Sequence, residues 1–173
     1  MLFRSSQLSH WVRKQEKYTI VLLGHAYNPF TMQSDENEIL DSIAKTTSSK
    51  EFFEYFNQVT GCFTLLVFTD TSTYIFGDPT GMQTTFYGML DGKKCIASHA
   101  NLVGDIFELE QNDYIKRLVG YKYFKLLGNS LPGDLSPFEN VKRLIPNHYA
   151  CFRDNQVKTE RFFCPSILDF ILL

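Results

Sequence analysis

The sequence predicts one α+β domain in which helices pack against antiparallel sheet. Short runs rich in β-branched and aromatic residues are separated by turn-forming dipeptides such as Asp91-Gly92, the pattern of β-hairpins. Other segments carry apolar residues at helical spacing. The chain has 173 residues, 44% of them hydrophobic and 15% aromatic, which is enough for one domain with a strand-rich core. This order of strands and helices suggests a layered α+β architecture.

The beginning of the chain predicts one strand and one helix after an unplaced segment. Residues 1–17 have no clear pattern. Residues 18–23 (YTIVLL) form a β-branched run that predicts a buried strand, and residues 24–29 are typical of the turn that ends it. Asp35, followed three residues later by Glu38, fits the capping box of a helix. The apolar stripe of this helix consists of Ile39, Leu40 and Ile43.

A second helix is predicted to begin at Ser49 and to end at Gly61, because glycine commonly terminates helices. Its apolar side consists of Phe52, Phe53, Phe56 and Val59. Residues 62–68 and 74–76 then predict a hairpin whose turn is formed by residues 70–72.

Two further hairpins are predicted around Asp91-Gly92 and Asp154-Asn155. Their strands are residues 84–89, 95–97, 149–152 and 157–162. Asn112 is predicted to cap a helix that ends at Gly128, and the proline-containing residues 131–146 are predicted as loop.

The tight loop over residues 77–81 is the clearest turn outside the hairpins. We expect the Asp78 carboxylate to set this turn by hydrogen bonds. Gly81 is expected to supply a backbone conformation that other residues avoid. Together with Gly61, these residues form the predicted set of structural turn positions.

Composition excludes several classes of function. The net charge of −2 and the pI of about 6.1 point to neither nucleic acid nor an anionic membrane as partner. No signal peptide and no apolar stretch of about 18 residues is visible, so a cytoplasmic protein is expected. The histidines are dispersed and the cysteines lack zinc-site spacing, so no metal site is expected. Three cysteines are expected as buried free thiols: Cys62, Cys95 and Cys151.

Several short motifs occur in the order found in one family. They are Leu23–Asn28 (LGHAYN), Ser34-Asp35, Gly61-Cys62-Phe63, Asp78 with Gly81, Phe86-Tyr87, Ala97-Ser98-His99 and residues 137–146 (PFENVKRLIP). With these motifs the chain resembles the N-terminal glutaminase domain of asparagine synthetase-like proteins, which are class II glutamine amidotransferases. The resemblance implies an Ntn-hydrolase-like layered sandwich of antiparallel sheets and helices over residues 18–163, with its N-terminal strands shortened. Residues 164–173 are then an apolar tail or the start of a truncated linker.

The same resemblance implies a catalytic apparatus that this chain departs from. The family uses an N-terminal cysteine as nucleophile, with its own α-amine as base. The chain opens with Met1-Leu2, so no catalytic residue is assigned. The oxyanion hole of the family comes from an Asn-Gly pair, and Leu23-Gly24 stands here, leaving the Gly24 backbone N–H as a donor.

Two further positions complete the expected vestigial substrate site. His25 stands where the family has glutamate, and Asp35 matches the aspartate that binds the substrate ammonium group. Asp35 also fits the N-cap of the predicted helix, and both interpretations stay open. His25 is expected as a loop histidine without a catalytic partner. Gly24, His25 and Asp35 therefore form the predicted vestigial site, and glutamine binding is not expected.

The resemblance predicts an asparagine synthetase-like homologue whose glutaminase portion is catalytically inactive in this chain. No pyrophosphate-binding loop is present, so no cofactor is expected here, and ATP and Mg²⁺ belong to a missing synthetase domain. The expected partners are such a synthetase domain or a second copy of the chain. The alternative is a non-catalytic scaffold or binding domain for a synthetase partner or a small ligand. An α+β binding domain without amidotransferase ancestry is a third hypothesis.

Overall fold

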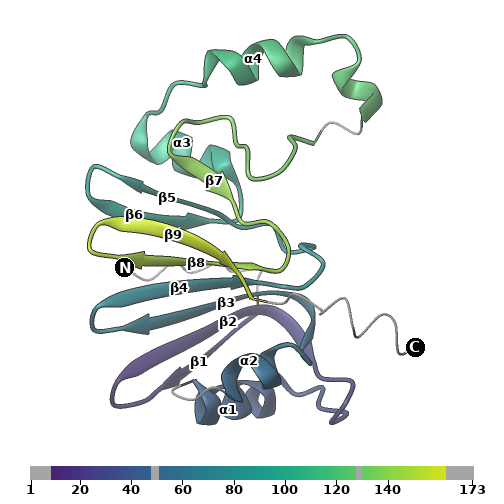
Figure 1. Cartoon of the computed structure of the whole chain (residues 1–173), viewed down its shortest axis with the longest axis vertical. Coiled ribbons are helices and arrows are strands. Elements are labelled where there is room, and N and C mark those ends of the chain that lie inside the picture. Colours follow the sequence, from purple (N-terminus) through teal and green to yellow (C-terminus); the bar gives the residue numbers. More distant parts are fainter. Residues whose placement is uncertain (1–8, 48–50, 128–129, 163–173) are drawn as a thin grey trace.

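The computed structural model describes residues 9–47, 51–127 and 130–162, and these form two antiparallel sheets (Figure 1). The large sheet has six strands in the order β1-β2-β3-β4-β8-β9, and the small sheet has three in the order β6-β5-β7. The strands of the large sheet are β1 His10–Lys14, β2 Tyr18–Tyr27, β3 Thr60–Thr69, β4 Ser72–Gly77, β8 His148–Arg153 and β9 Gln156–Arg161. The strands of the small sheet are β5 Phe86–Leu90, β6 Lys93–Ala97 and β7 Val141–Arg143. The helices are α1 Glu36–Thr46, α2 Glu51–Phe56, α3 Ala100–Phe107, α4 Asp113–Gly120 and the short 3-10 helix η1 Phe124–Leu127.

The elements stack as helix, sheet, sheet and helix. Side chains alternate across a strand, so Ile20 and Leu22 point to one face of the large sheet and Val21 and Leu23 to the other. The first face packs on α1 and α2, whose buried residues are Ile39, Leu40, Ile43, Ala44, Phe52 and Phe56. The second face packs on the small sheet through Tyr87, and the small sheet packs on α3 through Val103. The predicted layered α+β architecture is therefore correct.

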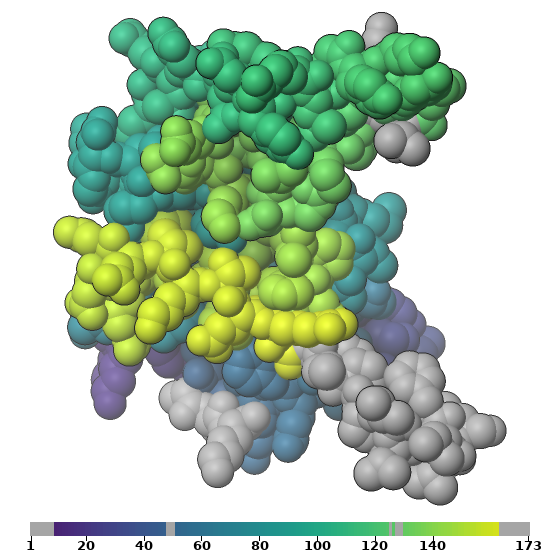
Figure 2. Space-filling model, turned by 45° about the horizontal axis from the view of Figure 1, so that its top comes forward, coloured from purple at the N-terminus to yellow at the C-terminus, as the bar shows by residue number. Residues whose placement is uncertain are grey.

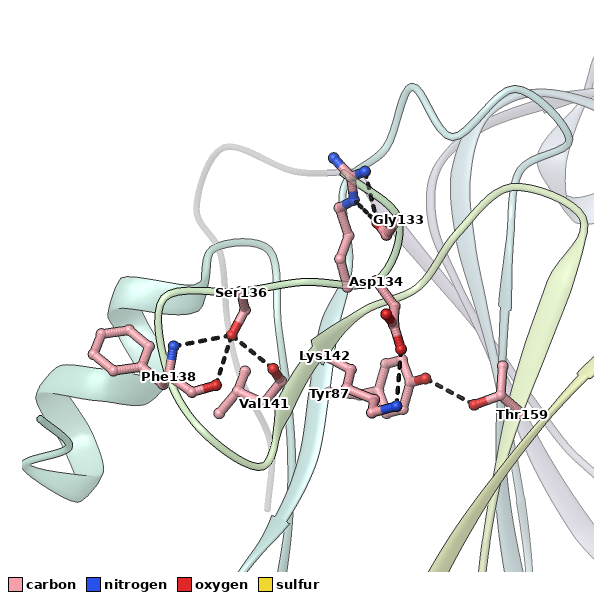
Figure 3. Close-up of polar contacts among 9 residues, drawn as sticks. Tyr87, Gly133, Asp134, Ser136, Phe138, Val141, Lys142 and Thr159 are labelled. Carbon is pink, nitrogen blue, oxygen red and sulfur yellow. Dashed lines mark hydrogen bonds and ion pairs between the residues drawn. The ribbon is translucent and has the colours of Figure 1, made fainter. Parts of the chain in front are cut away.

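Two hydrogen-bonded groups hold the small sheet and its loop in place (Figure 3). Tyr87 on β5 shares a 2.8 Å hydrogen bond with Thr159 on β9, which links the two sheets. Burial raises the pKa of the Tyr87 hydroxyl. The buried Ser136 hydroxyl donates to the Val141 carbonyl at 2.6 Å and accepts from the Phe138 N–H at 3.2 Å. The loop before β7 is thus fixed to its own strand.

Local sequence explains the elements that were predicted correctly. The Asp35 carboxylate accepts from the Asn37 N–H at 2.7 Å and caps α1, and Asn112 caps α4 through the Tyr114 N–H at 2.9 Å. The hairpins β5–β6 and β8–β9 turn on pairs of residues with positive φ, at 50° and 71° for Asp91-Gly92 and 50° and 56° for Asp154-Asn155. These angles are those of a type I′ turn.

The structure corrects the predicted end of the first strand. No turn occurs at residues 24–27, because β2 continues to Tyr27 and pairs with β3 along its whole length, from Tyr18 opposite Thr69 to Tyr27 opposite Thr60. Gly61 is therefore part of strand β3 and does not end the preceding helix, which stops at Phe56. Long-range pairing has overridden the local turn signal.

Other boundaries also differ from the predictions. Residues 10–14, in the segment left unplaced, form β1 and pair with β2. Residues 100–107 form α3, and residues 141–143 form β7 inside the predicted loop. The helix capped by Asn112 ends at Gly120. The expected stop at Gly128 and the tail over residues 164–173 lie outside the described residues.

The helical segment from α3 to η1 forms one end of the molecule, where it is coloured green in Figure 2. Its exposed apolar side chains are Leu102, Ile106, Tyr114, Val119, Tyr121, Tyr123 and Leu126. Cys62, Cys95 and Cys151 are free thiols, but only Cys95 is buried, whereas Cys62 and Cys151 are partly exposed. Within the described ranges, no helix is long and apolar enough to cross a membrane.

Candidate functional site

The expected site lies where β2, β3 and the loop after β4 meet. His25 on β2 is opposite Cys62 on β3 in the strand register. The loop after β4 is attached to the same place, because the Asp78 N–H donates to the Phe63 carbonyl at 3.1 Å and the Cys62 thiol lies 3.7 Å from the Gln83 side-chain oxygen. Residues far apart in the sequence are thus brought together at one end of the large sheet.

The Gly24 backbone N–H is already hydrogen-bonded within the protein. It donates to the Ser9 carbonyl at 2.9 Å, directly before β1. The expectation that Gly24 offers a free donor is therefore wrong, and the reason is the pairing of β1 with β2. Leu23 packs against the core between the two sheets and carries no hydrogen-bond donor on its side chain. Both positions of the expected donor pair are thus engaged within the protein, Gly24 by a backbone hydrogen bond and Leu23 by packing.

His25 belongs to an exposed strand position and not to a loop. Its side chain is 71% exposed, and Nδ1 lies 2.8 Å from the Glu36 carboxylate in the first turn of α1. The ring also meets the edge of Trp11 with a centroid distance of 5.8 Å. An exposed polar contact of this kind contributes about 0–1 kcal/mol to stability. The contact serves mainly to place the start of α1 beside the end of β2.

The Cys62 thiol belongs to the residue opposite His25 in the strand register, and its surroundings do not activate it. Burial raises the pKa of Cys62, and the neighbouring Asp78 carboxylate raises it further. Reactive cysteines need the opposite, a positive environment that stabilises the thiolate. The Cys62 thiol contacts Gln83, whereas His25 contacts Glu36, so the two side chains have separate partners. They do not form a nucleophile–base pair.

Asp35 is placed next to this segment by the His25–Glu36 contact, but its carboxylate caps α1. Oδ1 accepts the Asn37 N–H at 2.7 Å, and the backbone of Asp35 is extended as in an N-cap. The sequence left two interpretations of Asp35 open, an N-cap and a ligand of the substrate ammonium group, and this geometry is that of the N-cap. The geometry gives Asp35 a role in starting the helix, and the side chain remains exposed beyond that contact.

Asp78 is the most buried charged group of the region, with none of its surface exposed. One carboxylate oxygen accepts from the Thr80 N–H at 2.9 Å, the Thr80 hydroxyl at 2.7 Å and the Met82 N–H at 3.1 Å. The other accepts from the Gln83 N–H at 2.8 Å. Buried carboxylates are stable only when their oxygens are satisfied in this way. Asp78 is therefore engaged by its own loop and is not directed at a substrate.

Gly81 closes that loop in a left-handed conformation with φ of 68°. A Cβ at this position would lie 2.7 Å from Pro146, so the loop has no room for a larger residue. Sequence reasoning found Asp78 and Gly81 because their turn is local. It missed Ser9, Glu36 and Gln83, and of these only Glu36, directly after the capping Asp35, carried a local signal.

Over residues 9–47, 51–127 and 130–162, no three His, Cys, Asp or Glu side chains gather closely enough to hold a metal ion. The residues of the region instead hydrogen-bond to the backbone or to one another.

The two stacked antiparallel sheets with helices outside them form the expected Ntn-hydrolase-like layered sandwich, and solved structures share this fold. The chain is similar to the structure of the allosteric regulatory enzyme of purine biosynthesis, with a TM-score of 0.56 and 15% identity over 90% of this chain and 31% of that one. It is also similar to glutamine phosphoribosylpyrophosphate amidotransferase from B. subtilis complexed with ADP and GMP, with a TM-score of 0.50 and 13% identity over 92% of this chain and 32% of that one.

The chain thus spans about a third of the length of these two proteins. At such low identity the likeness establishes the fold and leaves the activity open. No protein-family model and no curated protein matches the sequence.

Proposed function

We propose that this chain is a glutaminase-like domain of the asparagine synthetase type that does not hydrolyse glutamine. The fold supports a glutaminase-like domain, and the ordered motifs from Leu23–Asn28 to residues 137–146 favour the asparagine synthetase branch. The observation that carries the loss of activity is the 2.9 Å hydrogen bond from the Gly24 N–H to the Ser9 carbonyl.

The chemistry of amide hydrolysis explains why this bond matters. Attack on the glutamine amide places negative charge on the carbonyl oxygen, and donors aimed at that oxygen lower the barrier. Removing one such donor typically costs about 2.7–4 kcal/mol in the transition state. Here the backbone donor is engaged by Ser9, and Leu23 has no side-chain amide to replace it. A thiol brought to this site from elsewhere would still meet a high barrier.

The direct test uses glutamine labelled with ¹⁵N in its side-chain amide. The purified chain is incubated with it, and glutamate and ammonium are followed by NMR beside a sample without protein. We expect the same rate in both samples. Release clearly above the protein-free rate, or mass spectrometric labelling of Cys62 by a diazoketone analogue of glutamine, contradicts the proposal.

A pair of variants tests whether the side-chain donor alone is missing. Leu23→Asn introduces the missing side-chain amide, and Leu102→Asn makes the same change on the exposed side of α3. We expect neither variant to gain activity, because the Gly24 N–H stays bonded to Ser9. Activity in Leu23→Asn alone would mean that only the side-chain donor was missing.

The second candidate function is a scaffold for a synthetase partner or for a second copy of the chain. The exposed apolar residues of α3, α4 and η1 favour it, since Ile106 is 60% and Leu126 is 78% exposed. Sedimentation of the purified chain across a concentration series tests self-association. A monomer at every concentration, with no change on addition of a synthetase domain, opposes the scaffold.

A further inference from the structure

A second group of polar residues lies on the large sheet, at the edge opposite to the β1–β2 segment. Strands β4, β8 and β9 carry three cross-strand rows of residues that point to the same face. The rows are Ser72–Arg153–Gln156, Tyr74–Cys151–Lys158 and Phe76–Tyr149–Glu160. This is the face that α1 and α2 cover farther along the sheet, where α1 packs on β1 and β2.

A cavity of about 310 Å³, open to solvent, lies on this face. It is lined by Tyr74, Tyr149, Cys151, Arg153, Asp154, Gln156, Lys158 and Glu160. At about 30 Å³ for each water molecule in the liquid, this is room for roughly ten waters, or a ligand of similar size. Its volume is at the lower end of the range for small-molecule sites. β9 is an edge strand and lies at the surface, coloured yellow in Figure 2, so a ligand can reach the cavity from solvent.

One wall of the cavity is aromatic and rigid. The rings of Tyr74 and Tyr149 lie 6.4 Å apart, and both pack on Phe76 in the core. Tyr149 also meets Phe53 of α2 at 6.0 Å. Cys151 is directly opposite Tyr74 in the strand register and lies on β8 with Tyr149, and it supplies a small, weakly polar part of the lining. Such a wall suits the apolar part of a ligand.

The other wall carries charge of both signs. Arg153 is held in place because its Nε donates to Ser72 at 2.8 Å and one terminal nitrogen donates to the Tyr74 hydroxyl at 3.4 Å. A guanidinium has five N–H donors, so most of its donors remain for a ligand. Lys158 on the next strand has no hydrogen-bond or ion-pair partner among the described residues. These two cations together fit a carboxylate.

Glu160 provides the complementary charge. One of its oxygens accepts from the Tyr149 hydroxyl at 2.5 Å, and the other has no partner among the described residues. Glu160 and Asp154 together balance the charges of Arg153 and Lys158, so the four ionised side chains that line the cavity sum to zero. A simple anion would face the carboxylates, and a simple cation would face Arg153 and Lys158. A ligand that carries both charges satisfies both walls.

We propose that this cavity binds a small zwitterion of amino-acid size. Its carboxylate lies between Arg153 and Lys158, its ammonium group meets Glu160, and its side chain packs on Tyr74 and Tyr149. The site is on β8 and β9, whereas the Gly24–His25 segment is on β2, so binding here does not require glutaminase chemistry.

Binding is tested by NMR titration and calorimetry of the purified chain. The probes are L-phenylalanine, L-leucine, L-glutamine and L-lysine, one for each kind of side chain. We expect at least one to bind and to shift the resonances of β8 and β9. No binding by any of the four at millimolar concentration overturns the proposal.

The need for both charges is tested with L-phenylalanine beside phenylpropionate, which lacks the ammonium group, and phenethylamine, which lacks the carboxylate. The same comparison uses the matching analogues of whichever probe binds. We expect each analogue to bind roughly tenfold more weakly, as for the loss of a charge-assisted hydrogen bond. Equal binding of either analogue contradicts a zwitterion site.

The location is tested with Lys158→Met and Glu160→Gln, which change exposed residues and leave the core intact. In Glu160→Gln the amide oxygen still accepts from Tyr149, so folding is preserved. We expect both variants to weaken binding by roughly tenfold. The control Lys93→Met, at an exposed position of β6, should bind within about twofold of the original chain. Unchanged affinity in both test variants places the ligand elsewhere and overturns the proposal.

Discussion

Gly24 and Gly61 occupy reciprocal positions across the β2–β3 ladder. A Cβ on Gly24 would lie 2.3 Å from the Cys62 carbonyl oxygen, and a Cβ on Gly61 would lie 2.3 Å from the His25 carbonyl oxygen. Both glycines have positive φ, 98° and 136°. They lie on either side of the His25–Cys62 pair. The backbone carbonyl of each strand therefore lies close to the glycine of the other strand, where a side chain would clash. This close approach allows β2 to continue where a turn was predicted.

Replacing either glycine should therefore destabilise the sheet. We expect Gly24→Ala and Gly61→Ala each to lower the free energy of unfolding by about 2–5 kcal/mol, since each adds a backbone clash to an unfavourable φ. Urea unfolding followed by circular dichroism measures the loss. Gly120→Ala is the control, because nothing lies within 4 Å of its added Cβ and its φ is not positive. If Gly24→Ala lowers the free energy of unfolding no more than Gly120→Ala does, β2 and β3 can move apart to admit the Cβ without a large loss of stability, which contradicts the prediction.

The buried Asp78 carboxylate leads to a second prediction. Asp78→Ala leaves three N–H donors and one hydroxyl without their acceptor, and we expect a loss of roughly 3–5 kcal/mol. Asp78→Asn keeps one side-chain oxygen as an acceptor and replaces the other by an NH₂ group. It should cost less, about 1–3 kcal/mol, because only one N–H donor then faces that NH₂ group. Equilibrium unfolding measures both. Asp70→Asn, at an exposed turn position, should change stability by less than about 0.5 kcal/mol. Equal losses in the two Asp78 variants would contradict this ranking.

The link between the two sheets gives a third prediction. The Tyr87 hydroxyl and Thr159 are 2.8 Å apart, and this pair joins β5 to β9 (Figure 3). We expect Tyr87→Phe to cost about 1 kcal/mol, the usual contribution of such a hydrogen bond. A double-mutant cycle with Thr159→Val isolates the pair, and its coupling free energy should be about 0.5–1.5 kcal/mol. A coupling indistinguishable from zero would show that the bond does not hold the sheets together.

Elements specified by local signals could be predicted from the sequence. The Asp35 cap, the Asn112 cap and the turns at Asp91-Gly92 and Asp154-Asn155 each depend on residues next to one another in the chain. Asp78 and its loop belong to the same group, because all hydrogen bonds of its carboxylate lie within five residues.

Features that depend on distant partners were not predictable in this way. Gly24 has the sequence signature of a turn, but its positive φ is used inside a strand that pairs with residues some forty positions away. β1 has no clear pattern of its own and forms because β2 presents a free edge. The Gly24 N–H is engaged because of that pairing. The residues of the candidate site could therefore be named from the sequence, but the hydrogen bond that occupies the Gly24 N–H could not.

Tyr149 provides a prediction for alkaline pH. Burial raises the pKa of Tyr149 to about 12, and the hydrogen bond to Glu160 contributes to this shift. In the unfolded chain the group titrates near pH 10, so the folded state retains the proton longer. The resulting stabilisation is complete below pH 10 and is lost as the pH rises toward 12. Tyr149→Phe has no such group, and its free energy of unfolding should fall less steeply across this window. Urea unfolding of both chains at several pH values measures the difference, and parallel slopes would contradict the raised pKa.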